Sequence, residues 1–245
     1  MEIDYEKKYH QVETENWWFI SRRRYLLDLL KDASRDFKIL DVGCSSGIFL
    51  KDLEHLGFKK QNLFGVDISE KAIANCKNNG IQNAFVMDAE NITIPEKFDI
   101  IVASDCLEHL KDDRKAIKNW KELLNEDGKM YVFVPAFQSL WSYHDEVNRH
   151  FRRYTNQELK EKLISEKLEV VKSSYWNFCL FVPVFFFRKI SVFFNKNRQH
   201  QEGQIVENKV ANSILLQLIL IENKLLKYIN FPFGISTFCI VKKID

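Results

Sequence analysis

The chain has 245 residues, 46% of them hydrophobic, which suits one α/β domain with an insertion. Its formal net charge of +2 argues against strong attraction to nucleic acid, so we expect no nucleic-acid partner. Its five cysteines include no C-x-x-C pair, which argues against a thiolate zinc site and favours a reducing, cytoplasmic compartment. The acidic segment 1–6 lacks the apolar core of a signal peptide.

Residues 1–36 are predicted to form a helical segment ahead of the main domain, which spans residues 37–245. Its apolar helical stripe consists of Leu26, Leu27, Leu29 and Leu30. The adjacent Trp17 and Trp18 cannot face the same way on a helix. We expect one to pack on the domain while the other covers a pocket; the alternative is that both are core residues.

A strand, a turn of small residues and a helix follow, over residues 37–42, 43–47 and 48–56. This order is the opening unit of a nucleotide-binding α/β sheet. Gly43 and Gly47 let the backbone take strained angles and approach a ligand closely. The N-terminus of the helix directs free N–H groups into the same space.

The acidic residue at the end of this strand indicates which ligand binds. A dinucleotide site needs G-x-G-x-x-G, which places a pyrophosphate on the helix N-terminus. Here Asp41 precedes Gly43, Ser45 and Gly47, and its carboxylate would repel phosphate but attract an ammonium group. S-adenosylmethionine has a sulfonium, an amino-acid tail and no phosphate. The stretch resembles the first motif of class I S-adenosylmethionine-dependent methyltransferases, with Ser45 replacing the middle glycine; the alternative is an ordinary βα turn.

The next two strands are predicted at Leu63–Asp67 and 83–87. Asp67 can accept hydrogen bonds from both ribose hydroxyls; alternatively, Asp67 or Ser69 caps the helix that follows. The resemblance implies that Ile68 packs on the adenine and that Asp88 and Ala89 reach its amino group. The alternative for Asp88 is a surface turn.

Residues 98–103 form a continuous apolar run, as in a buried parallel strand, and the family's L-E-H-L signature follows at 107–110. Together with the earlier motifs it identifies the chain as a member of the family. The resemblance implies cofactor contacts from Asp41, Gly43, Cys44, Ser45, Gly47, Asp67, Ile68, Asp88, Ala89, Ser104 and Leu107.

Asp105, Glu108 and His109 share one face of a helical turn, so their side chains can converge. Some relatives with an E-x-x-E-H arrangement bind a divalent metal, and oxygen donors suit a hard cation. We predict no metal here. Instead, Glu108 would be structural, and His109 would line the acceptor pocket as a general base or substrate contact.

An amphipathic helix over 112–125 is predicted to end at Gly128 in the left-handed conformation, before a fifth strand over 129–134. The segment 135–155 then carries histidines, arginines and aromatic residues past the carboxyl end of that strand, which predicts an acceptor-binding loop. It resembles the P-A…L-W…H-D…H-x-R-R-Y-T stretch of a branch with a W-W-F lead-in. Predicted acceptor contacts are Trp18, Phe19, Arg22, Trp141, His150, Arg152, Arg153 and Tyr154.

The alternative for Arg152 and Arg153 is a solvated lead-in to the helix at 156–165, with Thr155 and Glu158 forming a capping box. Strands at 168–174 and 236–242 should pair antiparallel, separated by a helical insertion at 178–230. Neither apolar run of the insertion reaches the ~18 residues of a membrane span.

Two arrangements of the insertion remain open. In the first, the helices cap the acceptor pocket or form a homodimer interface. Alternatively, they lie on a membrane with basic residues at the head groups, namely Arg188, Lys189, Lys196 and Arg198.

We therefore predict an α/β fold: a doubly wound, seven-stranded, mainly parallel sheet with an N-terminal helical lid and a C-terminal helical insertion. The predicted activity is O-methylation of a small-molecule, sugar or lipid-linked glycan acceptor, with S-adenosylhomocysteine as product. His109 and His144 are candidate bases and Asp145 a candidate orienting residue. Alternatives are a catalytically silent cofactor-binding scaffold and a nicotinamide-dependent oxidoreductase, which would need the missing G-x-G-x-x-G. The expected location is the cytoplasm, peripheral to the inner face of the membrane.

Overall fold

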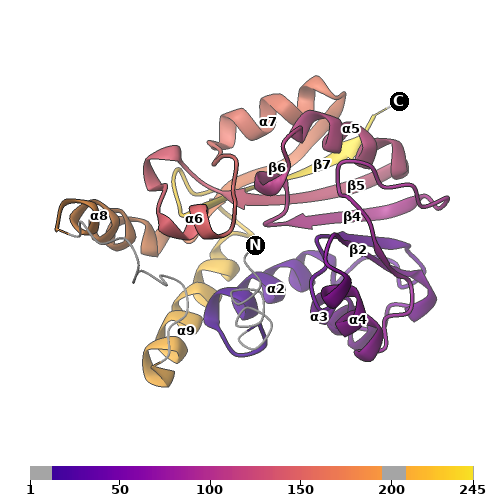
Figure 1. The fold of residues 1–245 in the computed structure, drawn as a ribbon, viewed down its shortest axis with the longest axis horizontal. Coiled ribbons are helices and arrows are strands. Elements are labelled where there is room, and N and C mark those ends of the chain that lie inside the picture. The colour runs from indigo at the N-terminus through magenta and orange to yellow at the C-terminus, as the bar shows by residue number, and fades with distance from the viewer. Residues whose placement is uncertain (1–12, 195–207, 245) are drawn as a thin grey trace.

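One seven-stranded sheet forms the centre of the molecule, and a computed structural model describes residues 13–194 and 208–244 (Figure 1). The strand order is β3-β2-β1-β4-β5-β7-β6. The first five strands pair in parallel, whereas β7 runs antiparallel to both β5 and β6. This confirms the predicted doubly wound, mainly parallel sheet. The strands are β1 (Ile39–Val42), β2 (Leu63–Asp67), β3 (Ala84–Val86), β4 (Phe98–Ser104), β5 (Leu124–Pro135), β6 (Leu168–Trp176) and β7 (Ser236–Lys243).

Helices cover both faces of the sheet because successive strand residues point to opposite sides. On β1, Ile39 packs on one face with α2, α3, α4 and α9, while Leu40 packs on the other with α5 and α7 (Figure 1). The helices are α2 (Trp17–Leu30), α3 (Ile48–His55), α4 (Glu70–Asn78), α5 (Asp113–Leu123), α6 (Tyr143–Val147), α7 (Asn156–Ser165), α8 (Phe178–Phe194) and α9 (Lys209–Leu225).

The strand order reverses between β1 and β4, which lie side by side although β2 and β3 come between them in the chain. At such a switch point the connections leave in opposite directions and open a crevice at the carboxyl ends of the strands. The turn after β1, the segment after β4 and the loop after β5 all meet at this edge. The fold thus gathers the predicted motifs at one place.

Strand β5 begins earlier than the sequence predicts. It starts at Leu124, directly after α5, and a shift in its pairing with β4 accommodates the segment 125–128. In this segment, Asp127 has the positive φ, at 63°. The prediction that Gly128 adopts the left-handed conformation was therefore wrong. Gly128 is still constrained, because a Cβ there would lie 2.9 Å from the carbonyl oxygen of Asn125.

The N-terminal helix α2 is part of the main body. Trp17 and Trp18 are each only 6% exposed, so both pack in the core. The side chain of Asn212, on α9, accepts from the Trp17 backbone N–H at 2.8 Å. Asn223, which lies eleven residues after Asn212 on α9, donates to the Ser21 carbonyl at 2.9 Å. Helix α9 therefore holds α2 in place, although about 200 residues separate the two helices in the sequence.

Helices α8 and α9 lie between β6 and β7 in the chain, at the same end of the molecule as α6 (Figure 1). In the described part of the chain, no helix is both long and apolar enough to cross a membrane. Both helices expose apolar side chains, including Val182, Phe186, Phe187, Val210, Ile214, Ile221 and Leu225.

Of the four basic residues expected at lipid head groups, the structure describes the side chain of Arg188 alone. Arg188 turns inward and donates to the carbonyl of Leu140, so it does not project from the helix. Lys196 and Arg198 lie outside the described residues, as do residues 1–12 of the predicted lid, and the Lys189 side chain is not described either.

Candidate active site

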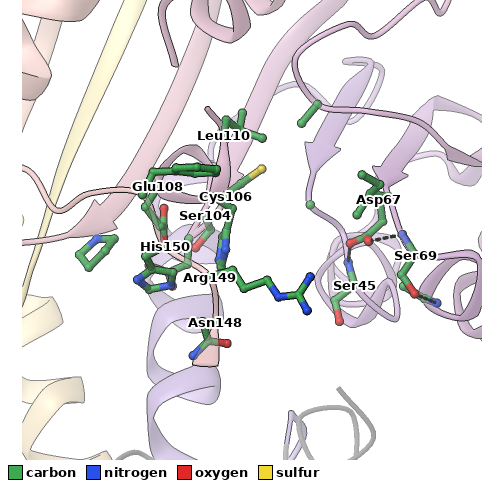
Figure 2. Close-up of a pocket in the computed structure, with 18 of the residues that line it drawn as sticks. Ser45, Asp67, Ser69, Ser104, Cys106, Glu108, Leu110, Asn148, Arg149 and His150 are labelled. Atoms are coloured by element: carbon green, nitrogen blue, oxygen red, sulfur yellow. Dashed lines mark hydrogen bonds between the residues drawn. The ribbon is translucent and has the colours of Figure 1, made fainter. Parts of the chain in front are cut away.

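A cavity of about 500 Å³ opens at the carboxyl edge of the sheet (Figure 2). A recess of about 70 Å³ adjoins it, since both are lined by Trp18, Phe19, Gly43, Ser45, Ser104 and Asp105. Seven of the predicted cofactor residues line the large cavity: Gly43, Ser45, Asp67, Ile68, Asp88, Ala89 and Ser104. Asp41 and Cys44 line the recess.

The turn after β1 has little space for larger side chains. Gly47 caps α3 at φ 76°, and a Cβ there would lie 2.8 Å from the sulfur of Cys76. Cys44 directs its own sulfur away from the ligand space, 3.6 Å from that of Cys76. Gly47 and Leu107 line neither space among the described residues, because one packs on α4 and the other is fully buried. These two shape the turn and the core rather than the cavity walls.

The recess is acidic. Asp41 is only 6% exposed, and burial raises its pKa to about 8, with further contributions from the charges of Asp67 and Glu13. Glu13 reaches the turn directly, where its carboxylate accepts from the Ser46 hydroxyl. A cationic ligand would relieve this repulsion, and a phosphate would add to it. The observed surroundings of Asp41 therefore fit the ammonium and sulfonium of S-adenosylmethionine.

One buried arginine stands opposite these carboxylates. Arg22 is 3% exposed, and its guanidinium carbon lies 4.1 Å from the ring centroid of Trp176. It donates to the Ser236 hydroxyl at 3.0 Å and pairs with Asp105 at 3.5 Å. The sequence predicts an acceptor contact for Arg22, but the structure places it in the recess beside Asp41.

The opposite side of the glycine turn carries the residues predicted for ribose and adenine. Asp67 accepts from the backbone N–H groups of Ser45 at 3.0 Å and Ser69 at 2.9 Å. Ser69 in turn caps α4. Asp67 thus helps to order the helix start and still lines the cavity, so its two predicted roles are compatible. Ile68 is 75% exposed, and a flat apolar ligand would cover it.

Three imidazoles gather at the far end of the cavity, where His109, His144 and His150 all line the wall. The rings of His109 and His150 meet edge to face at 4.5 Å, and those of His144 and His150 lie 6.1 Å apart. Burial lowers the pKa of His109 and of His144 to about 3 in each case. Both imidazoles are therefore neutral at physiological pH and can accept a proton or bind a metal.

Asp145 is fully buried and does not line the cavity among the described residues, so it cannot touch a substrate. Its Oδ1 lies 2.8 Å from Nδ1 of His150, a histidine that the sequence did not group with Asp145. The guanidinium of Arg153 grips both carboxylate oxygens, at 2.7 and 3.0 Å. These contacts hold the pKa of Asp145 well below its usual range, against the effect of its burial.

The loop 136–154 is closed at its base, where Ala136 and Tyr154 form an isolated bridge. Four predicted acceptor residues line the cavity: Trp18, Phe19, His150 and Arg153. Trp141, Arg152 and Tyr154 are not among the described lining residues. Tyr154 is buried and donates to Asp113, which also pairs with Arg152 at 2.8 Å.

The predicted capping box of Thr155 and Glu158 is present at the start of α7.

The carboxylates after β4 do not converge as predicted. Asp105 turns toward Arg22, whereas Glu108 and His109 approach His150. The potential ligand atoms of Glu108, His109 and His150 lie within 4.8 Å of one another. Sequence reasoning did not group His150 with the other two because 41 residues separate it from His109.

Some residues of the cavity wall have strained backbone angles. Three non-glycine lining residues have positive φ: Ser45 at 47°, Asp105 at 55° and Arg149 at 57°. Each such residue costs of order 1–3 kcal/mol, and such strain clusters at functional sites. Arg149 extends across the cavity from the side of His150 toward Ser45 (Figure 2). Sequence reasoning missed Arg149, which carries no recognisable local pattern. Glu13 belongs to the N-terminal segment that the sequence predicts to be a lid.

Known proteins that resemble this chain include methyltransferases. Residues 40–132 match the family described as "Methyltransferase domain". Ubiquinone biosynthesis O-methyltransferase from Coxiella burnetii is 32% identical over 122 residues, which cover 47% of this chain. The chain spans less than half, 46%, of the length of that relative.

Two solved structures share the fold. One is the complex between the Haloferax volcanii Trm112 methyltransferase activator and a methyltransferase, with a TM-score of 0.66, 14% identity and coverage of 99% of this chain and 95% of that one. The other is the N-methyltransferase NodS from Bradyrhizobium japonicum with S-adenosylhomocysteine, at a TM-score of 0.59, 16% identity and coverage of 95% and 91%. Residues 40–132 therefore match a methyltransferase domain, and the chain shares the fold of these two solved structures.

Proposed function

We propose that the chain transfers a methyl group from S-adenosylmethionine to a hydroxyl oxygen of a small-molecule acceptor. The observation that carries this proposal is a single cavity with an acidic recess at one end and three imidazoles at the other. The cofactor supplies a methyl group already activated by the sulfonium. The protein therefore has to align the two reactants and exclude water from them.

Each wall of the cavity has a proposed part in holding the cofactor. Asp41 and Glu13 face its ammonium group, and Arg22 binds its carboxylate. Asp67 accepts from the ribose hydroxyls, because it stands at the carboxyl end of β2 and lines the cavity. The adenine packs on Ile68. These assignments are supported by the charge of the residues that line the recess and the cavity.

The imidazole end would receive the acceptor. We assign His144 as the group that takes the hydroxyl proton, because it lines the cavity and is neutral at physiological pH. Its side chain is held by Asn148, whose amide nitrogen lies 3.1 Å from the Nε2 of His144.

The test is the variant His144→Ala. Transfer of labelled methyl from S-adenosylmethionine should fall by about 100-fold or more, the usual contribution of a positioned base. The affinity for S-adenosylhomocysteine, measured by calorimetry, should stay the same, because the cofactor end is unaltered. His55→Ala, an exposed histidine on α3, is the matched control. Unchanged turnover in His144→Ala would remove this residue from the mechanism.

The same assays separate the remaining functions. An oxidoreductase would not bind S-adenosylhomocysteine, and a silent scaffold would bind it without labelling any acceptor. The acceptor itself should combine a reactive hydroxyl with an apolar body, because Phe19, Leu110 and Phe151 share the cavity wall with the histidines. Sugars and lipid-linked glycans are included in this class. A membrane-lipid extract incubated with labelled cofactor, followed by mass spectrometry, would identify the product.

The protein would work in the cytoplasm, peripheral to the inner face of the membrane. The exposed apolar side chains of α8 and α9 support this location, because they lie at the same end of the molecule as α6 (Figure 1). An acceptor with an apolar body could then reach the cavity without leaving the lipid surface. A homodimer joined through the same helices is the competing arrangement.

A further inference from the structure

We propose that Glu108, His109 and His150 bind one divalent cation at the acceptor end of the cavity. One ligand atom from each lies within 4.8 Å of the other two, and all three residues line the cavity. The segment after β4 supplies Glu108 and His109, while the loop after β5 supplies His150. The site therefore exists only in the folded chain.

The carboxylate of Glu108 is the first observation that points to a ligand. Glu108 is 1% exposed, and its Oε2 atom has no hydrogen-bond partner among the described residues. A buried carboxylate oxygen without a partner is costly, so native proteins satisfy nearly all such atoms. A cation beside His109 and His150 would provide the missing partner (Figure 2).

The second observation is the fixed orientation of His150. Its Nδ1 lies 2.8 Å from Oδ1 of the buried Asp145, which Arg153 holds from the other side. A histidine that ligates a metal almost always donates its other ring N–H to such a carboxylate. The contact with Asp145 leaves Nε2 of His150 as the nitrogen free to ligate. Asp145 is thus a positioning residue for the site.

The donor set indicates the kind of cation. Two imidazoles and one carboxylate suit Mn²⁺, Fe²⁺, Co²⁺ or Zn²⁺ better than Mg²⁺ or Ca²⁺, which prefer oxygen ligands. Three protein ligands also leave positions open toward the cavity, as in catalytic rather than structural sites.

The role of this cation rests on the proposed methyl transfer. The acceptor hydroxyl would bind at an open position, where the cation lowers the pKa of its O–H group. His144 takes that proton, and the oxygen then forms a bond to the methyl carbon as the sulfonium C–S bond breaks. The products are the methyl ether and neutral S-adenosylhomocysteine, and His144 returns its proton to solvent.

Metal binding can be measured without any methyl transfer. Untagged, chelator-treated full-length protein is titrated with Co²⁺ or Mn²⁺, followed by visible absorption or calorimetry. We expect one ion per chain. Glu108→Gln, which keeps the side-chain shape, and His150→Ala should each weaken binding by at least tenfold, whereas the exposed control His55→Ala should not.

Calorimetry with S-adenosylhomocysteine on the same proteins shows that the variants are folded and separates the two proposals. Variants that keep wild-type affinity for S-adenosylhomocysteine but lose the ion support the site. Absence of ion binding in the wild type, or equal binding in Glu108→Gln and His150→Ala, would overturn it and leave the proposed methyl transfer standing. Ion binding without labelled methyl uptake from any extract would instead contradict the proposed function.

Discussion

The ionised form of Asp41 is unfavourable in the protein without a ligand. It lies at the end of a buried strand, and Asp67 and Glu13 add negative charge nearby. Burial and these neighbours raise its pKa to about 8, so the free protein holds a proton there at pH 7. A cationic ligand stabilises the ionised carboxylate, and binding is then coupled to loss of that proton.

The first prediction follows from this coupling. Because Asp41 must lose a proton below pH 8, the affinity for S-adenosylmethionine should rise with pH by up to about tenfold per pH unit, and level off above pH 8. Calorimetry in two buffers of different ionisation heat would measure the protons released at pH 7. Asp41→Asn should bind weakly, with no such pH dependence; an equally steep profile in that variant would exclude Asp41 as the source.

The contact between Asp145 and Arg153 is also a property of single residues, and it concerns stability. Both side chains are almost completely buried. Asp145→Asn would leave the guanidinium charge without its counter-ion, and breaking a buried pair costs about 3–5 kcal/mol. Urea unfolding should show this loss. Asp127→Asn, in a pair with Lys242 where Asp127 is 82% exposed, is the matched control and should change little. Similar midpoints for the two variants would contradict the prediction.

Among the secondary structure elements, α9 connects parts of the molecule that are far apart in the chain. Asn223 on this helix accepts from Nε1 of Trp176 on β6 at 2.7 Å and donates to Ser21 on α2. Glu222, its neighbour, accepts from the backbone N–H of Cys179 at the start of α8. One turn of α9 therefore joins the N-terminal helix, the last part of the sheet and the other helix of the insertion.

We predict that Asn223→Leu lowers the free energy of unfolding by about 1–3 kcal/mol for each buried group left unpaired. The unpaired groups would be the indole N–H of Trp176 and the carbonyl of Ser21. Denaturant unfolding would measure the change. Gln217→Leu, at an exposed position of α9, provides the comparison. If both variants unfolded at the same denaturant concentration, the role given to Asn223 would be wrong.

Elements whose pattern is local could be predicted from the sequence. The strand, turn and helix around Gly43 are adjacent in the chain, and the capping box at Thr155 is a four-residue pattern. The contacts of Asp145 could not be predicted, because the choice between His144 and His150 depends on how α6 turns after Ser142. Nor could the start of β5, where a bulge extends the strand through a segment that has turn residues.

At the scale of the whole molecule, the exposed apolar surface of α8 and α9 is the main unexplained feature. Phe186 and Phe187 are 59% and 63% exposed, so leaving them in water is unfavourable. We predict that the protein co-sediments with vesicles of phosphatidylcholine and phosphatidylglycerol. The double variant Phe186→Ser with Phe187→Ser should bind less, because less apolar area enters the lipid.

Ile164→Ser is the control for this measurement, because Ile164 is 56% exposed on α7, away from the insertion. Its binding should equal that of the wild type. A wild-type protein that stays in the supernatant would refute the membrane contact. A dimer in light scattering that the double variant abolishes would show that the two helices bind a second copy instead.

Strand β7 lies between β5 and β6 although it comes last in the chain, and α9 holds α2 from almost 200 residues away. During synthesis, the ribosome must therefore release the chain through β7 before the part of the cavity lined by Ile235 and Ser236 is complete. A nascent chain of 200 residues would contain the glycine turn and all three clustered histidines, yet would lack the pieces that close around them. The complete cavity should accordingly form only after β7 has been synthesised.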